Sequence, residues 1–258
     1  MKRARIKKMF VDDSGMHCIL LSDTELFYNH WDSDYIYRID VFSEEHFNDR
    51  NGTSVANMTL KSIDIKVIED NLFELVAGTS EGHILHACYM AQPQQGDCST
   101  IEKFDRVIEI EDQEPIEDIK IIKIHEYVSI IAASSAKLYQ FVGRDDGLRL
   151  ILDQYKYNRN MRNSHSITIP GRKLQGEESK HEEGPDPRAS ALARDAIEQP
   201  RLQLIFQELE DGRGYQVAGF GWMSDSLFFH AQFDADNIDG AHKLVVRSPR
   251  PKDDKRIR

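Results

Sequence analysis

Tyr127 to Gly143 reads YVSIIAASSAKLYQFVG and predicts two short strands folded back on each other. The first half, Tyr127 to Ala132, is a nearly continuous apolar run of the kind that is buried inside a sheet. The small residues Ala133 to Ala136 can turn the chain tightly, and 137–142 then alternate in the pattern of a second strand. The stretch therefore predicts a β-hairpin that Gly143 ends.

Three further hairpins are predicted by the same combination of apolar runs and turn residues. Their turns lie at Ser22-Asp23-Thr24, Gly78 to Gly82 and Ser224-Asp225-Ser226. The four turn centres, near residues 23, 80, 134 and 225, are about 57, 54 and 91 residues apart, and a loop insertion accounts for the last interval. Recurring all-β units of this size are typical of propeller blades. We therefore expect an all-β fold, an irregular WD40-like β-propeller that is incomplete; the alternative is a β-sandwich, because short strands alone do not separate the two.

The composition divides the chain into four parts. Residues 1–153 are expected to form the first part of the propeller, with a loop at Ala91 to Ser99 and the last strand at Leu148 to Leu152. Residues 154–200 hold four of the eight prolines and a run of charges, so we expect a long disordered insertion with a short helix at Ala189 to Glu198. Further propeller strands are expected over 201–247 and a basic tail over 248–258.

The charge and the cysteines limit the possible partners. The chain has 44 acidic and 33 basic residues and a net charge of -11, which opposes binding to nucleic acid phosphates or anionic lipid. Its three cysteines, Cys18, Cys88 and Cys98, form no CxxC pair, so a reducing compartment is expected, without a disulfide framework or a zinc site. No apolar run is long enough for a membrane span. The basic N-terminus is interpreted as a solvated start of the first strand rather than as a targeting signal.

The residues that usually carry chemistry form no recognisable motif in this sequence. His17, His83, His86 and His125 stand beside apolar residues in predicted strands, and each is interpreted as a structural or surface histidine. His83 and His86 are three positions apart, so on one strand they face opposite sides and cannot share a metal. The acidic pairs Asp12/Asp13 and Glu44/Glu45 occupy turns, where turn formation explains them.

Three remaining features also have structural explanations. Asp234 to Gly240 resembles a calcium loop, but Ile238 and Val245 stand at ligand positions. The glycines at 78–82 and 212–214 are too close together for a phosphate-binding loop. Phe220 and Trp222 either pack between blades, the favoured interpretation, or form an exposed hot spot. We expect no catalytic, cofactor-binding or metal-binding residues, no cofactor and no enzymatic activity.

Four segments together resemble the N-terminal β-propeller portion of the vacuolar protein sorting-associated protein 18 family, also called the deep orange family. They are MFVDDSG at Met9 to Gly15, which continues into MHCILL and ELFYN; VAGTSEGHI at Val76 to Ile84; Tyr127 to Arg144; and FGWMSDSLFFH at Phe220 to His230. The resemblance covers roughly 5–145 and 216–234 and does not include 150–205 or the residues beyond Gln232. Family members continue into an α-solenoid and a zinc-binding RING domain, so the chain is expected to be a fragment or a shortened version.

The resemblance implies a scaffold that binds other proteins. Deep orange proteins are core class C subunits of the HOPS and CORVET complexes, which tether vesicles at late endosomes and at lysosomes or vacuoles before membrane fusion. The implied partners are the other HOPS and CORVET subunits, the implied location is cytoplasmic and peripheral on those membranes, and membrane contact is indirect, through the complex. No nucleic acid and no small-molecule substrate is implied. The alternatives are an unrelated β-propeller that acts as a ligand-binding or enzymatic module, and an inert truncated product.

Overall fold

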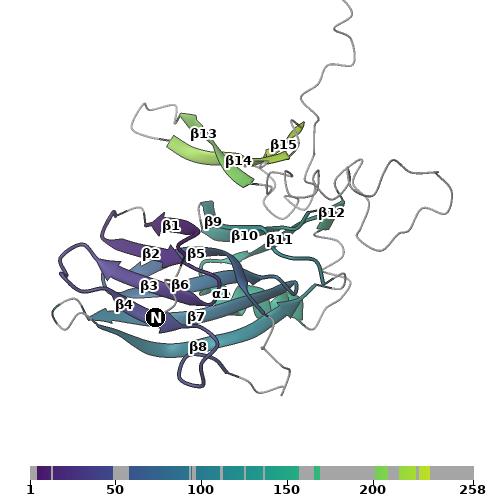
Figure 1. Cartoon of the computed structure of the whole chain (residues 1–258). Coiled ribbons are helices and arrows are strands. Elements are labelled where there is room, and N and C mark those ends of the chain that lie inside the picture. Colours follow the sequence, from purple (N-terminus) through teal and green to yellow (C-terminus); the bar gives the residue numbers. More distant parts are fainter. Residues whose placement is uncertain are drawn as a thin grey trace, which may run out of the picture.

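The computed structural model describes residues 5–12, 14–48, 58–92, 94, 97–110, 113–124, 126–135, 137–156, 166–168, 201–208, 215–224 and 227–232. Within these ranges the chain forms antiparallel β-sheets and one α-helix (Figure 1). No helix in the described part is long and apolar enough to cross a membrane.

The first two sheets have four strands each, in the order in which they follow along the chain. In the first sheet, His17–Leu21 and Glu25–His30 alternate buried and less buried side chains, as expected for a sheet with one face in the core. The two central strands of the second sheet, Leu72–Thr79 and His83–Gln92, are buried along almost their whole length, as expected for a sheet covered on both faces. The first sheet contains β1 (Lys8–Val11), β2 (His17–Leu21), β3 (Glu25–His30) and β4 (Tyr37–Asp40). The second contains β5 (Leu60–Glu69), β6 (Leu72–Thr79), β7 (His83–Gln92) and β8 (Asp97–Glu109).

The third and fourth sheets repeat this order. The third contains β9 (Asp118–Ile124), β10 (Tyr127–Ala133), β11 (Lys137–Arg144) and β12 (Ser166–Thr168). The fourth contains β13 (Arg201–Glu208), β14 (Tyr215–Ser224) and β15 (Leu227–Gln232).

All four predicted hairpins are confirmed. They are the antiparallel pairs β2–β3, β6–β7, β10–β11 and β14–β15. In the hairpin of the opening stretch, Ala133 pairs with Leu138 next to the turn and Tyr127 pairs with Arg144 at the open end. Each hairpin therefore marks one sheet.

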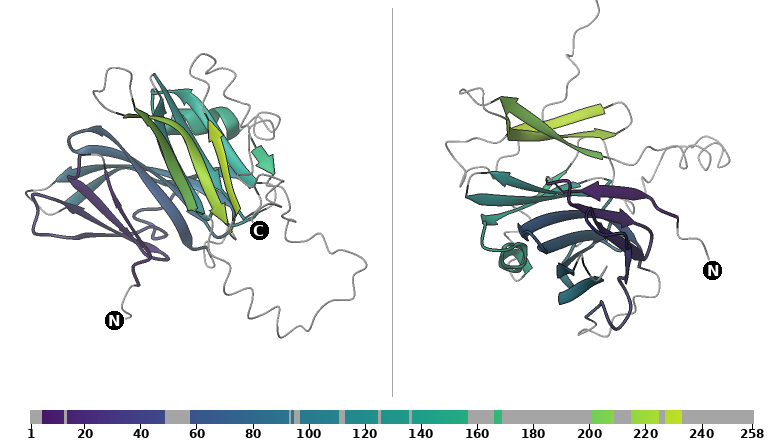
Figure 2. Two further views of the ribbon diagram at one scale, coloured as in Figure 1. Left: turned by 90° about the horizontal axis from the view of Figure 1, so that it is seen from above. Right: turned by 90° about the vertical axis from the view of Figure 1, so that its left-hand side faces the viewer.

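The sheets are arranged as consecutive propeller blades. The first strand of each sheet contacts the first strand of the next: β1 with β5, β5 with β9, and β9 with β13. The view from above shows the first, second and third sheets following one another in chain order (Figure 2). Within the described residues they do not close into a ring. The fold is thus an incomplete all-β propeller, and the β-sandwich alternative is wrong because the strands form separate blades rather than two facing sheets.

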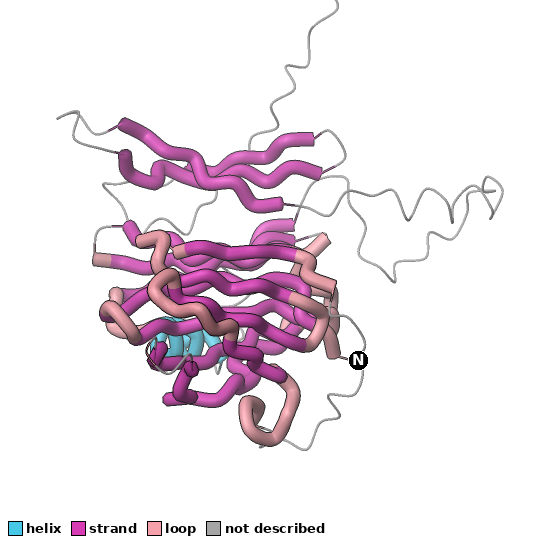
Figure 3. Tube along the Cα trace, turned by 60° about the vertical axis from the view of Figure 1, so that its left-hand side comes forward, coloured by secondary structure: helices cyan, strands magenta, loops and turns pink. Residues whose placement is uncertain are grey.

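The predicted strand at Leu148 to Leu152 is wrong, because these residues begin helix α1 (Leu148–Lys156). Its buried residues, Leu148, Ile151, Leu152 and Tyr155, recur at helical spacing and form one apolar stripe. The stripe packs against β8 and β11, and the Tyr155 ring meets the Phe141 ring edge-on at 5.2 Å. Figure 3 shows the helix in cyan among the magenta strands. The apolar residues of Leu148 to Leu152 were interpreted as a strand because this short window does not show the helical spacing.

Two further expectations need correction. The segment from Ala91 to Ser99 was interpreted as a loop, yet β8 already begins at Asp97 and runs through to Glu109. Register shifts against β7 interrupt the regular alternation of β8, which explains why the pattern missed it. In the expected insertion 154–200, residues 154–156 complete α1 and Ser166–Thr168 form β12, while the remaining positions, including the helix expected at Ala189 to Glu198, lie outside the described residues.

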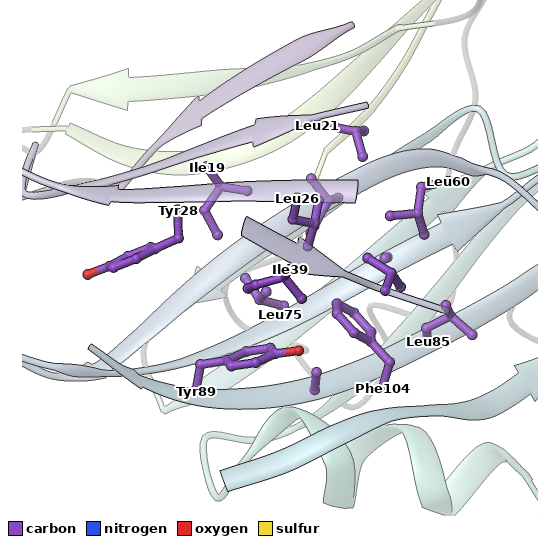
Figure 4. Close-up of a cluster of buried hydrophobic side chains, with 14 of the residues drawn as sticks. Ile19, Leu21, Leu26, Tyr28, Ile39, Leu60, Leu75, Leu85, Tyr89 and Phe104 are labelled. Carbon is purple, nitrogen blue, oxygen red and sulfur yellow. The ribbon is translucent and has the colours of Figure 1, made fainter. Parts of the chain in front are cut away.

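Among the described residues, the core forms two clusters, each between consecutive sheets. The first lies between the first and second sheets and includes Ile19, Leu26, Leu75 and Phe104 (Figure 4). In it, Phe73 stacks between the rings of Tyr28 and Tyr89, with centroids 5.1 Å and 6.0 Å away. The second cluster joins the second sheet to the third sheet and α1. Because the first three blades bury apolar side chains against one another, burial of apolar surface holds these blades together.

Candidate functional site

His17 is buried and fully engaged in packing and hydrogen bonds. Its Nε2 lies 3.1 Å from the main-chain oxygen of Asp70, which can only accept, so Nε2 carries the proton and Nδ1 accepts from the Tyr28 hydroxyl at 3.2 Å. Burial lowers the pKa of His17 below its usual value, although the Asp12 carboxylate opposes this shift. The imidazole is therefore neutral near pH 7 and ties β2 to the turn between β5 and β6.

His83 and His86 are both buried on β7, and His125 lies outside the described residues. Burial and the charge of Arg106 lower the pKa of His83. The Nε2 of His86 lies 3.1 Å from a carboxylate oxygen of Glu74. Among the described residues, no group of three or more His, Cys, Asp or Glu side chains has a geometry that could hold a metal ion.

The Glu74 carboxylate joins the second sheet to the helix. It accepts the N–H of Leu148, the first residue of α1, at 3.1 Å and 3.2 Å, and it also bonds to His86. Burial by itself would raise the pKa of Glu74, but the hydrogen bonds from His86 and Leu148 and the charge of Lys66 hold it below its usual value. A residue of β6 thus caps a helix 74 positions later in the chain, which is a structural role.

The acidic pairs that were assigned to turns lie in turns where they are described. The Asp12 carboxylate accepts the main-chain N–H groups of Ser14 at 3.1 Å and His17 at 2.8 Å, which shapes the turn between β1 and β2. Glu44 and Glu45 lie in the turn after β4, where Lys103 donates to the main-chain oxygen of Glu44 at 2.8 Å. Asp13 lies outside the described residues.

The other singled-out features are only partly described. Gly82 occupies the turn between β6 and β7 with a φ of 71°, a conformation that favours glycine. Residues 212–214 and 234–240 lie outside the described residues. Phe220 and Trp222 belong to β14, where their backbones pair with Leu204 and Leu202 of β13, but their side chains are outside the description. Whether they pack or are exposed stays a prediction.

Charged side chains gather where the first strands of the sheets meet. Asp118 of β9 accepts the N–H of Leu202 in β13 at 2.9 Å and lies 3.5 Å from the Lys8 ammonium of β1. Nearby, Lys61 of β5 is 3.7 Å from Glu117. Asp118, which belongs to the third sheet, therefore contacts the first strand of the first sheet and the first strand of the fourth sheet. We interpret this arrangement as a polar connection between blades, since every charge named has a partner of opposite sign.

Asp64 makes a similar connection between β5 and β9. Its carboxylate accepts the N–H of Ile121 at 2.7 Å and lies 4.0 Å from the Lys120 ammonium, and its side chain is 15% exposed. Burial raises the pKa of Asp64 from 3.8 to about 6, and the nearby Lys120 and the Ile121 N–H only partly offset this. The ionised carboxylate therefore reduces the stability of the fold at neutral pH.

We expect Asp64→Asn to stabilise the chain at pH 7. The folded carboxyl takes up its proton at a higher pH than the unfolded one, so its contribution to stability is largest below pH 3.8 and is lost as the pH rises through about 6. Asparagine keeps an acceptor for Ile121 without the charge, so the gain at pH 7 should be about 1 to 3 kcal/mol. Urea unfolding of both proteins between pH 4 and pH 7 measures this gain. Asp40→Asn, at an exposed position, is the control, and a gain that does not grow with pH would contradict the assignment.

A groove of about 810 Å³ opens between the first and second sheets at the end that carries the β1–β2, β3–β4, β5–β6 and β7–β8 connections. We call it the end groove. Asp32 and Asp70 are the acidic residues among those that line it, and none of the described lining residues is a lysine or arginine. The complete lining is Ser14, Met16, His17, His30, Asp32, Val67, Asp70, Asn71, Ala91, Gln92 and Gln94.

Large apolar side chains stand exposed in the β3–β4 connection, which also supplies Asp32 to the end groove. Trp31 lies between two lining residues, His30 and Asp32, and is 77% exposed; Tyr35 and Ile36, in the same connection, are each 62% exposed. No binding site predicted from the sequence included these residues. The available signal was WDSDYI at 31–36, where large apolar residues stand on both sides of a short acidic and polar turn.

The comparison with protein families decides the assignment. The family model for the Pep3/Vps18/deep orange beta-propeller domain matches residues 1–255. The chain belongs to this family. The Pep3/Vps18/deep orange match also corrects the extent of the resemblance, because it includes 150–205 and the residues beyond Gln232. The spacing of the hairpins predicted the blades. The short motifs covered only part of the matched range, because 150–205 and the residues beyond Gln232 contain no such motif.

Membership of the Pep3/Vps18/deep orange family supports a role in vacuolar protein sorting at the level of the family. Propeller scaffolds of this kind are typically non-catalytic and bind other proteins. No curated protein matches the sequence.

Solved structures with a similar arrangement include two from fission yeast. The WD40 domain of SCAP matches with a TM-score of 0.43 and 12% identity, over 90% of this chain and 43% of that one. A chain of the complex of the SREBP and SCAP binding domains matches with a TM-score of 0.43 and 13% identity, over 91% of this chain and 63% of that one. The chain thus spans less than two thirds of the length of either.

Proposed function

We propose that the chain is a non-catalytic docking domain of a vesicle-tethering complex of the HOPS or CORVET type, acting in transport from endosomes to lysosomes or vacuoles. The observation that carries the proposal is the family match over residues 1–255. The partners are other class C sorting subunits, and the domain reaches late endosomal and lysosomal or vacuolar membranes from the cytoplasm through the assembled complex.

The described side chains support a docking role over a catalytic one. Buried His17 and His86 bond to Tyr28 and Glu74, and the carboxylates of Glu74 and Asp64 bond to backbone N–H groups and lie near lysines. The thiol pKa of Cys88 is raised to about 11 by burial and by Glu74 and Glu102, which keeps it protonated and unreactive. A rigid set of blades with open connections at its ends offers surfaces for other proteins.

Affinity capture tests this proposal. Tagged residues 1–258, expressed in cells and recovered under mild conditions, should retain the other class C subunits, which mass spectrometry identifies. We expect these subunits to be enriched at least about tenfold over the tag alone, corresponding to about 1.4 kcal/mol of binding preference.

The control bait carries Gly78→Ala, a substitution that we expect to disrupt packing between blades and therefore to lose the captured subunits. Imaging of the same fusion gives the second readout, with co-localisation on late endosomal and lysosomal or vacuolar membranes expected. Capture of no tethering subunit by the folded, unaltered bait would contradict the proposal.

A further inference from the structure

We propose that the end groove binds an extended segment of another protein that carries a lysine or arginine flanked by apolar residues. The inference deepens the proposed docking function by assigning a site and a partner chemistry. The test measures peptide binding by the purified protein. The groove proposal can therefore fail while the docking function holds, and the docking function can fail while the groove binds the peptide.

The size and lining of the groove fit a peptide segment. Its volume of about 810 Å³ lies within the range of about 300 to 1,000 Å³ that is usual for pockets that hold small ligands. Met16 and Val67, both partly exposed, provide apolar surface for flanking side chains. Asn71, Gln92 and Gln94 provide amide donors and acceptors of the kind that pair with the main chain of an extended peptide.

Charge complementarity selects a basic occupant. Asp32 and Asp70 enter the groove from different sheets, and among the described residues neither carboxylate pairs with a lysine or arginine. The histidine deepest in this region, His17, is neutral near pH 7 because burial lowers its pKa, so it does not cancel their charge. A cation placed between them would be attracted, and an acidic segment would be repelled by the same field and by the net charge of -11.

The exposed aromatic residue beside the groove favours the same occupant. Trp31 is 77% exposed, which is unusual for a residue with so much apolar surface. Its main-chain N–H donates to the oxygen of Met16 at 2.8 Å, so the backbone that carries it is held at the groove. Tryptophan offers the strongest cation–π face for a lysine or arginine, and exposed tryptophans are common hot spots for protein partners.

The experiment measures binding of a defined probe to the full chain. The probe is a fluorescein-labelled eight-residue peptide in which lysine, leucine and serine alternate; two matched probes replace the lysines with glutamate or with serine. Fluorescence anisotropy is recorded at low and at physiological salt. We expect the lysine probe to bind at least about tenfold more tightly than either matched probe and to weaken as salt increases.

Matched variants locate the binding. Asp32→Asn with Asp70→Asn should weaken the lysine probe about five- to tenfold, as expected for removing two charge contacts at a partly exposed site. Asp40→Asn with Glu81→Gln changes the net charge equally at exposed positions at the opposite ends of the strands, and it should change binding less than about twofold. Trp31→Ala should weaken binding about fivefold.

Three results would overturn the proposal: equal binding of the glutamate probe, equal losses in the two Asp/Glu double variants, or no loss in the Asp32/Asp70 double variant. Circular dichroism and thermal unfolding of every variant show whether the fold is retained. If the Asp32/Asp70 pair unfolds, Trp31→Ala and the salt dependence still decide the outcome, because Trp31 is exposed and its side chain contributes little to the core.

Discussion

Gly78→Ala is expected to lower the free energy of unfolding by about 3 kcal/mol or more, which is a large part of the 5 to 15 kcal/mol that is usual for a folded domain. A Cβ atom at this position would lie 2.4 Å and 2.5 Å from side-chain carbons of Ile116 and 2.6 Å from the Ser62 hydroxyl. All three distances are far inside van der Waals contact, and a buried interior is too densely packed to yield. Urea unfolding followed by fluorescence measures the loss.

The cost arises because Gly78 lies where the second and third sheets meet. The Ser62 hydroxyl donates to the main-chain oxygen of Ile116 at 3.0 Å, and the Ile116 N–H donates to the oxygen of Thr79 at 3.0 Å. Moving Ile116 away to admit a methyl group would break these bonds and separate the blades. Gly15→Ala is the matched control: Gly15 has a φ of 72° but nothing within 4 Å, so the cost there is backbone strain alone, about 1 kcal/mol. Equal losses in the two variants would contradict the packing argument.

Glu74→Ala is expected to destabilise the chain by about 3 kcal/mol. The substitution leaves the buried N–H of Leu148 without an acceptor, removes the partner of His86 and deprives Lys66 of one of its two carboxylates. Because Leu148 begins α1, the helix should separate from β8 and β11 before the sheets unfold. Hydrogen exchange of α1 compared with β6 and β7 measures this local loss.

Glu74→Gln separates the contribution of the cap from that of the charge. Glutamine retains an acceptor for Leu148, so its cost should be about 1 kcal/mol. The pH dependence provides a second readout: the pKa of Glu74 is lowered in the folded state, so its contribution is present above pH 4.5 and is lost as the pH falls through the folded pKa. A Glu74→Ala protein with unchanged protection of α1 would show that the helix does not depend on this cap.

The hairpins could be predicted because their determinants are local. In the β10–β11 hairpin, the apolar run, the small turn residues and the following alternation all lie within Tyr127 to Gly143, and the strands formed where this pattern placed them. The spacing of the four turns was then sufficient to predict a propeller. The helix was missed because Leu148 to Leu152 is too short a window to show the helical spacing that Tyr155 completes, and because its capping residue, Glu74, lies far away in the sequence.

The candidate site was largely out of reach of sequence reasoning. The histidines were interpreted as structural or surface residues because apolar residues flank them in the sequence. In the structure, His17 and His86 bond to buried partners. The end groove combines four connections that are separated by up to about eighty residues, and its acidic lining depends on which blades become neighbours. The sequence shows a tryptophan at position 31, but it does not predict that the side chain is exposed.

From its sequence alone, this protein was determined to be a chain of β-hairpins with propeller spacing, a net negative charge and no catalytic motif, because turn chemistry, strand alternation and charge are properties of neighbouring residues. The tertiary structure decided the rest: the helix at Leu148–Lys156, the close approach at Gly78, the raised pKa of Asp64 and the end groove. Each of these arises where blades distant in the chain pack together, and such contacts are fixed by burial of apolar surface around a shared axis rather than by local preference.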